Sequence, residues 1–269
     1  MTELVQEISA KGGQSARPPQ WLRAQAGKRP LRARYLPGEG VPLVALHGIS
    51  RDADAIWRAF QPHAQSRGRA LLVPGFDAKA WPHFQRIDTA RPDLPLLDLL
   101  REAGLAGRKI DLFGYSGGAQ LAHRFAMLYP HRVARLHIAA PGWFCLPDTR
   151  ALWPEGLAKP GLPGLRKFDP AALSRLQLPA YLALPVRIWV GDKDGKRDAA
   201  LRQSPDLDRL QGLTRIDRAH AYAEAFTRAA RAIGITPDID VTLLPGCGHD
   251  FTQCAKLGGL AAKVTQSTL

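Results

Sequence analysis

The chain has 269 residues, 45% of them hydrophobic, so it can bury a sizeable core and has the composition of a globular protein. No run of about 18 uncharged apolar residues occurs, so we expect no membrane span. The net charge is +13, but the arginines are scattered and the motifs of nucleic-acid-binding domains are missing, which predicts a basic surface and no nucleic-acid partner.

The cysteine content bears on metals and on the compartment. The chain contains Cys145, Cys247 and Cys254, an odd number without paired spacing, which argues against a disulfide framework and against a zinc site. Residues 1–20 carry Glu3 and Glu7 and lack the apolar core of a secretory signal. We therefore expect reduced thiols, a cytoplasmic location and no metal.

From residue 30 onwards, short apolar runs alternate with helical patterns. After an expected edge strand at 30–37, runs typical of buried parallel strands cover 41–48, 69–76, 108–116, 133–142, 184–192 and 239–248. Helices are predicted at 53–66, 94–103, 117–129, 213–233 and 255–264. This alternation predicts the α/β class, with a mostly parallel central sheet and helices on both faces.

Two segments fall outside the alternation. We interpret residues 1–29 as an N-terminal tail and 30–269 as one domain. Within that domain, 143–183 is rich in Pro, Gly, Trp and Leu and is expected to be a short cap. It follows the fourth strand, whose carboxyl end opens on the ligand-binding edge of the sheet, so Trp143, Phe144 and Trp153 are expected to contact substrate. Alternatively, these side chains seal the core beneath a long loop.

The sequence Gly114-Tyr115-Ser116-Gly117-Gly118 joins the third strand to a helix. A G-x-S-x-G pattern is weak by itself, but between a strand and a helix it is typical of a sharp turn that lifts a serine hydroxyl above the sheet. The start of the helix also directs N–H groups toward a developing anion. We therefore predict that Ser116 is a nucleophile and not an ordinary loop serine.

A serine nucleophile needs a base, and the base needs an orienting carboxylate. His249 follows the last predicted strand in the sequence LPGCGHDF, and we interpret it as the base rather than as a surface histidine. Asp192, Asp194 and Asp198 follow the fifth strand, and each satisfies the chain order of nucleophile, acid and histidine.

Together these features resemble the α/β-hydrolase superfamily, over about residues 43–251. The stretches HGISRDAD and GDKDGKRDAALRQSP also resemble bacterial esterases related to polyhydroxyalkanoate depolymerases. The superfamily pattern G-x-x-D corresponds to residues 191–194, which implies that Asp194 is the acid, with Asp198 as the second choice.

The same resemblance implies an oxyanion hole. An H-G dipeptide at 47–48 places the backbone N–H of Ile49 in that hole, and the N–H of Gly117 is the second donor. His47 itself is expected to be structural.

The resulting prediction is a serine hydrolase without a cofactor that cleaves a small-molecule carboxylic ester through an acyl-enzyme. Three alternatives use the same triad: a thioesterase, an acyltransferase or an amidase. A fourth is a non-catalytic binding protein on the same fold.

Overall fold

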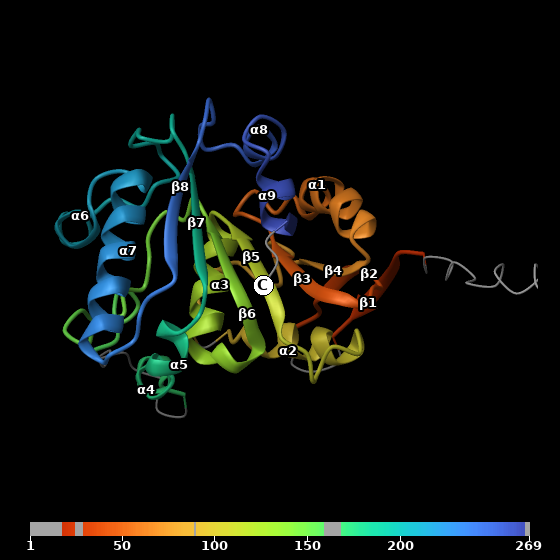
Figure 1. Ribbon diagram of the computed structural model, residues 1–269, viewed down its shortest axis with the longest axis horizontal. Coiled ribbons are helices and arrows are strands. Elements are labelled where there is room, and N and C mark those ends of the chain that lie inside the picture. Colours follow the sequence, from red (N-terminus) through yellow and green to blue (C-terminus); the bar gives the residue numbers. More distant parts are fainter. Residues whose placement is uncertain (1–17, 25–28, 89, 159–167, 267–269) are drawn as a thin grey trace, which may run out of the picture.

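An eight-stranded sheet forms the centre of the molecule (Figure 1). The structure is a computed structural model and describes residues 18–24, 29–88, 90–158 and 168–266. The strands are β1 (Gln20–Arg23), β2 (Arg32–Leu36), β3 (Gly40–Leu46), β4 (Arg69–Gly75), β5 (Ile110–Tyr115), β6 (Val133–Ala139), β7 (Val186–Gly191) and β8 (Ile239–Leu244). Their order is β1-β2-β4-β3-β5-β6-β7-β8. β2 is antiparallel to β1 and β4, and the other pairs are parallel, which confirms the predicted class.

Helices pack on both faces of the sheet. One face carries α1 (Ala53–Ser66), α8 (Phe251–Lys256) and α9 (Leu260–Gln266), with α1 and α9 side by side (Figure 1). The other face carries α2 (Asp93–Glu102), α3 (Gly117–Leu128) and α7 (Arg215–Ala232). Shorter elements are the 3-10 helix η1 (Pro130–Arg132), α4 (Pro170–Leu176), α5 (Leu178–Leu182) and α6 (Pro205–Gln211).

Each central strand is buried on both faces, which explains its continuous apolar sequence. In β3, Leu43 and Ala45 pack with the α1 side, whereas Val44 and Leu46 pack with the α3 side. Successive side chains of a strand point to opposite faces, so one apolar run supplies both hydrophobic cores. The parallel strands therefore place their carboxyl ends at one edge of the sheet, where the loops that follow them meet.

The structure corrects three expectations. Within the predicted tail 1–29, residues 20–23 form β1 and pair with β2, so the boundary at residue 30 is wrong; residues 1–17 lie outside the described part. The predicted closing helix is interrupted before α9 at Gly259, which has a positive φ of 62°. Helix α6 was not predicted, although Ser204 followed by Pro205 is a typical helix start.

No helix in the described part of the chain is long and apolar enough to cross a membrane.

Candidate active site

Ser116 occupies a strained turn between β5 and α3. Its φ of 51° and ψ of −112° are conformations that non-glycine residues rarely adopt, and its backbone N–H donates to the carbonyl of Ala139 in β6 at 2.8 Å. The turn is also tight, because a Cβ at Gly114 would lie 2.3 Å from the carbonyl oxygen of Gly118. The elbow therefore needs glycine at position 114, two residues before Ser116, to close.

The elbow brings Ser116 to His249 and Asp194, which are distant in the sequence. The Oγ of Ser116 lies 3.2 Å from Nε2 of His249, and Nδ1 of His249 lies 2.9 Å from Oδ2 of Asp194. A carboxylate only accepts hydrogen bonds, so Nδ1 carries the proton and Nε2 is free to accept from the serine hydroxyl. This is the arrangement in which a histidine can remove the proton of a serine.

Two adjacent loops hold His249 against Asp194. Asp194 follows β7 and His249 follows β8, and these strands pair in parallel up to Gly191 and Leu244. The loops are also joined by a hydrogen bond from the backbone N–H of Lys193 to the carbonyl of Cys247, at 2.9 Å. A Cβ at Gly191 would lie only 2.1 Å from that carbonyl oxygen, so glycine at this position allows the loops to meet.

Of the three candidate aspartates, the structure places Asp194 against His249. Asp198, the second choice, instead accepts two hydrogen bonds from Arg215, at 2.7 and 3.0 Å. Arg215 also donates to Oδ1 of Asp194 at 2.9 Å. Arg215 was not predicted from the sequence, because no motif marks a contact between the start of α7 and the loop after β7.

The backbone groups expected to form an oxyanion hole lie close together. A Cβ added to Gly117 would lie 3.4 Å from the backbone nitrogen of Ile49. Gly117 is the first residue of α3, where a backbone N–H has no partner within the helix. Two N–H groups at these positions would be suited to bind a developing oxyanion, and that role stays a prediction.

His47 holds the loop that carries Ile49. Its Nε2 accepts from the backbone N–H of Phe76 at 2.9 Å, and its Nδ1 lies 2.8 Å from the carbonyl of Gly48. Burial lowers the pKa of His47, which favours the neutral ring that this accepting Nε2 requires. The contacts agree with the structural role expected for it.

The cap aromatics are almost completely buried. Trp143, Phe144 and Trp153 expose 3%, 0% and 5% of their surface. The ring of Phe144 is enclosed and stacks on Tyr222 with centroids 4.4 Å apart. This packing agrees with the alternative that side chains of the predicted cap seal the core. For Trp143, Phe144 and Trp153, a contact with substrate stays a prediction.

Arg124 of α3 contacts two residues of the segment predicted to be a cap. Its guanidinium lies 4.2 Å from the ring centroid of Trp143 and donates to the carbonyl of Pro154 at 3.2 Å. Burial lowers the pKa of Arg124 to about 10, so it still carries its charge at neutral pH. A buried cation stacked on the cap tryptophan ties the cap to the helix that begins at the elbow.

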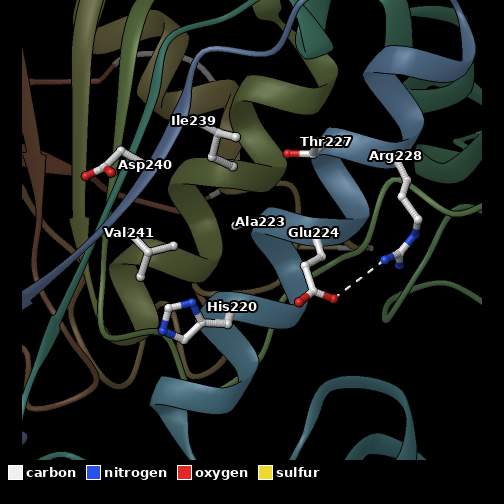
Figure 2. Close-up of a pocket in the computed structure, with 8 residues that line it drawn as sticks. All are labelled: His220, Ala223, Glu224, Thr227, Arg228, Ile239, Asp240 and Val241. Atoms are coloured by element: carbon white, nitrogen blue, oxygen red, sulfur yellow. Dashed lines mark ion pairs between the residues drawn. The ribbon is translucent and has the colours of Figure 1, made fainter.

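Several cavities lie away from Ser116, Asp194 and His249, two of them beside α6 and α7. A cavity of about 630 Å³ is formed by cap and α6 residues, namely Ala151, Leu152, Glu155, Arg202, Ser204, Asp206, Leu207, Arg209 and Leu210. A groove of about 440 Å³ lies between α7 and the first residues of β8 (Figure 2). Its lining residues are His220, Ala223, Glu224, Thr227, Arg228, Ile239, Asp240 and Val241. His249 follows the opposite end of β8, so this groove is not part of the candidate active site.

Within the described ranges, no group of three His, Cys, Asp or Glu side chains is arranged to hold a metal ion.

No family model matches this sequence, and no curated protein is significantly similar to it. Solved structures are similar over almost the whole chain. Poly(aspartic acid) hydrolase-1 from Sphingomonas sp. KT-1 has a TM-score of 0.74 at 21% identity, covering 93% of this chain and 98% of that one. LpqC, a poly(3-hydroxybutyrate) depolymerase from Bordetella parapertussis, has a TM-score of 0.72 at 25% identity, covering 93% and 94%.

A third similar structure is Est1E from Butyrivibrio proteoclasticus, with a TM-score of 0.53 at 16% identity and coverage of 91% and 96%. These likenesses and the sheet order show that the chain has the α/β-hydrolase fold. The structures that share this fold with it include hydrolases and a depolymerase.

Proposed function

We propose that the protein is a serine hydrolase that cleaves a carboxylic ester through an acyl-enzyme intermediate. The observation that carries the proposal is the continuous contact from Ser116 through His249 to Asp194, at 3.2 and 2.9 Å. The similarity to hydrolases supports it at the level of reaction class. In this proposal Ser116 is the nucleophile, His249 the general base and acid, and Asp194 the orienting carboxylate.

Acylation follows from the tautomer of His249. Its free Nε2 takes the hydroxyl proton while Oγ of Ser116 forms a bond to the acyl carbon, and the carbonyl oxygen becomes an oxyanion. The N–H groups of Ile49 and Gly117 donate to that oxyanion. Each such donor typically contributes about 3 kcal/mol to the stability of the transition state. When the tetrahedral intermediate collapses, the carbon–oxygen bond to the leaving alcohol breaks and His249 donates its proton to that alcohol.

Deacylation repeats the steps with water. His249 removes a proton from a water molecule, whose oxygen attacks the acyl carbon bound to Ser116. The second tetrahedral intermediate releases the carboxylic acid, and Oγ of Ser116 recovers its proton from His249. The cycle needs no group other than the triad, the two N–H donors and water.

The first test is covalent labelling. A fluorophosphonate probe should label Ser116, and Ser116→Ala should lose both the label and the hydrolysis of short p-nitrophenyl esters. Ser66→Ala is the matched control, because Ser66 is an exposed residue at the end of α1 whose hydroxyl hydrogen-bonds with His63 and Arg67. Labelling that persists in Ser116→Ala would reject the assignment.

A second candidate is cleavage of an anionic polymer by the same triad. The net charge of +13 favours association with anions, and one similar structure is a poly(aspartic acid) hydrolase. The test compares the release of fragments from poly(aspartic acid), an anionic polymer, with release from poly(3-hydroxybutyrate), an uncharged polyester. Preference for the anionic polymer supports the second candidate, and preference for the polyester supports the first. Faster cleavage of the anionic polymer, strongly reduced by about 0.5 M salt, is expected only if charge attraction contributes.

The cytoplasmic location stays a prediction.

A further inference from the structure

We infer that Arg215 and Asp198 tune the acid–base pair of the candidate triad, with Arg215 as a positioning residue for Asp194 and Asp198 as the counter-charge that preserves the basicity of His249. The inference rests on the proposed function. It assigns roles to two residues that touch neither Ser116 nor the acyl carbon.

One guanidinium bridges the two aspartates. Nη1 of Arg215 donates to Oδ1 of Asp194 at 2.9 Å and to Oδ2 of Asp198 at 2.7 Å, and its Nη2 donates to Oδ1 of Asp198 at 3.0 Å. The other oxygen of Asp194, Oδ2, contacts His249. Both oxygens of Asp194 are therefore engaged, and the planar fork of Arg215 fixes the direction in which this carboxylate meets the imidazole.

The burial of the three side chains differs in a way that matters for charge. The side chains of Arg215 and Asp194 expose 1% and 2% of their surface, whereas that of Asp198 exposes 39%. A buried arginine that paired with Asp194 alone would neutralise the carboxylate that stabilises the imidazolium of His249. Asp198 adds a second negative charge, so the three groups together carry a net charge of −1 next to the imidazole.

The titration behaviour of the bridge agrees with this pairing. The hydrogen bonds from Arg215 lower the pKa of Asp198 to about 2, so Asp198 is ionised throughout the neutral range. Burial acts to lower the pKa of Arg215, but the hydrogen bonds and charges of Asp198 and Asp194 outweigh it and raise that pKa. Asp198 and Arg215 therefore both keep their charges in the neutral range.

Other charged or titratable groups lie near His249 and near Arg215. Tyr115 stacks on the His249 ring with centroids 5.5 Å apart, and burial raises its pKa well above the ordinary value. Burial likewise raises the pKa of Cys254 to about 12. Asp250 lies next to His249 in the sequence, and Arg218, which interacts electrostatically with Arg215, is paired with Asp208. The tyrosine and the thiol stay neutral near pH 7, and the variants proposed below leave all these groups in place.

The start of α7 positions Arg215 independently of its side chain. Thr214 and Asp217 form a capping box, in which each side chain accepts from the backbone N–H of the other residue. Arg215 is the first residue of the helix, and α7 packs against β7 and β8, which carry the triad loops. A substitution of Arg215 therefore leaves the helix start capped.

The experiment follows the protonation midpoint of His249 by NMR of the ¹⁵N-labelled imidazole in the full chain, with His249→Ala used to assign the signal. Asp198→Asn removes the counter-charge and should lower the midpoint by about 0.5 to 1 pH unit. Arg215→Met removes the cation and should raise it by a similar amount or more. The double variant restores the net charge of −1 and should return the midpoint to within about 0.3 units of the wild type.

Arg215→Lys separates charge from geometry. It keeps the cation but cannot bridge both aspartates with a planar fork, so the midpoint should stay close to that of the wild type while kcat falls and KM does not change. Because Asp198 is partly exposed, the shift caused by Asp198→Asn should shrink in about 1 M NaCl.

Opposite shifts in the two single variants support the inference. Shifts in the same direction, or none, in folded variants would overturn it. If Arg215→Met does not fold, Asp198→Asn decides alone, since a midpoint that fails to fall rejects the counter-charge role. The midpoint is measured without substrate, so failure of the proposed function would be seen separately, as absent labelling of Ser116.

Discussion

Replacement of Asp194 by asparagine tests the candidate triad at its most constrained point. The substitution keeps the size of the side chain but exchanges one accepting oxygen for a donating NH2 group. Arg215 can only donate, so it holds the remaining oxygen of the amide at the position of Oδ1. The NH2 group then faces Nδ1 of His249, which must become an acceptor. The ring proton therefore moves to Nε2, where it blocks acceptance of the Ser116 proton.

The wrong tautomer sets the size of the effect. In a serine triad this exchange lowers kcat by about 10⁴-fold. At about 1.36 kcal/mol for each factor of ten, the barrier rises by about 5.4 kcal/mol. The fold should suffer much less, because Arg215 keeps its two hydrogen bonds to Asp198. We expect the free energy of unfolding to fall by about 1–3 kcal/mol, the cost of one weakened buried hydrogen bond.

The assay is kcat and KM for p-nitrophenyl acetate, with thermal unfolding and circular dichroism as controls of folding. Asp198→Asn is the matched variant, since it changes the same chemical group in the same loop without touching His249. We expect it to lower kcat by less than about tenfold, because a slightly weaker base reduces proton transfer only modestly.

The reasoning is refuted if Asp198→Asn is the crippling substitution and Asp194→Asn is mild. It is also refuted if Asp194→Asn retains more than about a tenth of the activity while the protein stays folded. Either result would mean that the contact at 2.9 Å between His249 and Asp194 does not orient the base.

Four further predictions concern single residues. Ser116→Ala should melt within a few degrees of the wild type but lose turnover, which active-site titration would show. Gly117→Ala would bring a Cβ to 2.7 Å from Cγ2 of Ile49 and displace an N–H donor, so kcat should fall about 10- to 100-fold with little change in KM. Trp153→Ala removes a buried ring and should lower the unfolding free energy by about 3–5 kcal/mol. If Trp153 also lines the acyl pocket, the rate for long-chain esters should change relative to the rate for acetate. An equal change for all chain lengths would indicate structural damage alone. The pKa of Asp198 is about 2 in the folded protein, below the unfolded value of about 3.9. The ionised Asp198 therefore contributes to stability above pH 4, and this contribution is lost as the pH falls through 2. The melting temperatures of wild type and Asp198→Asn should differ at about pH 5 and converge by about pH 2.

The sequence by itself determined the class of fold and the residues of the elbow. Continuous apolar runs that alternate with helical patterns already required a parallel sheet covered on both faces, because each strand buries both of its sides. Ser116 stood out because a strand, a glycine-rich turn and a helix follow one another without a gap. These are local signals, and the physical chemistry that produces them acts within a few residues.

Other features depended on contacts between distant segments. The residues alone offered Asp192, Asp194 and Asp198, and the family resemblance favoured Asp194. The approach of the β7 and β8 loops then puts Asp194 against His249. Arg215 contacts Asp194 because α7 packs against β7 and β8. No spacing in the sequence encodes this contact.

The segment predicted to be a cap is a second case in which composition could not decide the packing. Its apolar composition favoured a substrate pocket and also allowed a sealed core, and only packing could show that Phe144 stacks on Tyr222 and is fully enclosed. Likewise, residues 20–23 carry no strong strand signal, yet they pair with β2 because the edge of the sheet offers free backbone groups. A sequence states what each segment needs to bury or bond, whereas the tertiary structure decides which distant partner meets that need.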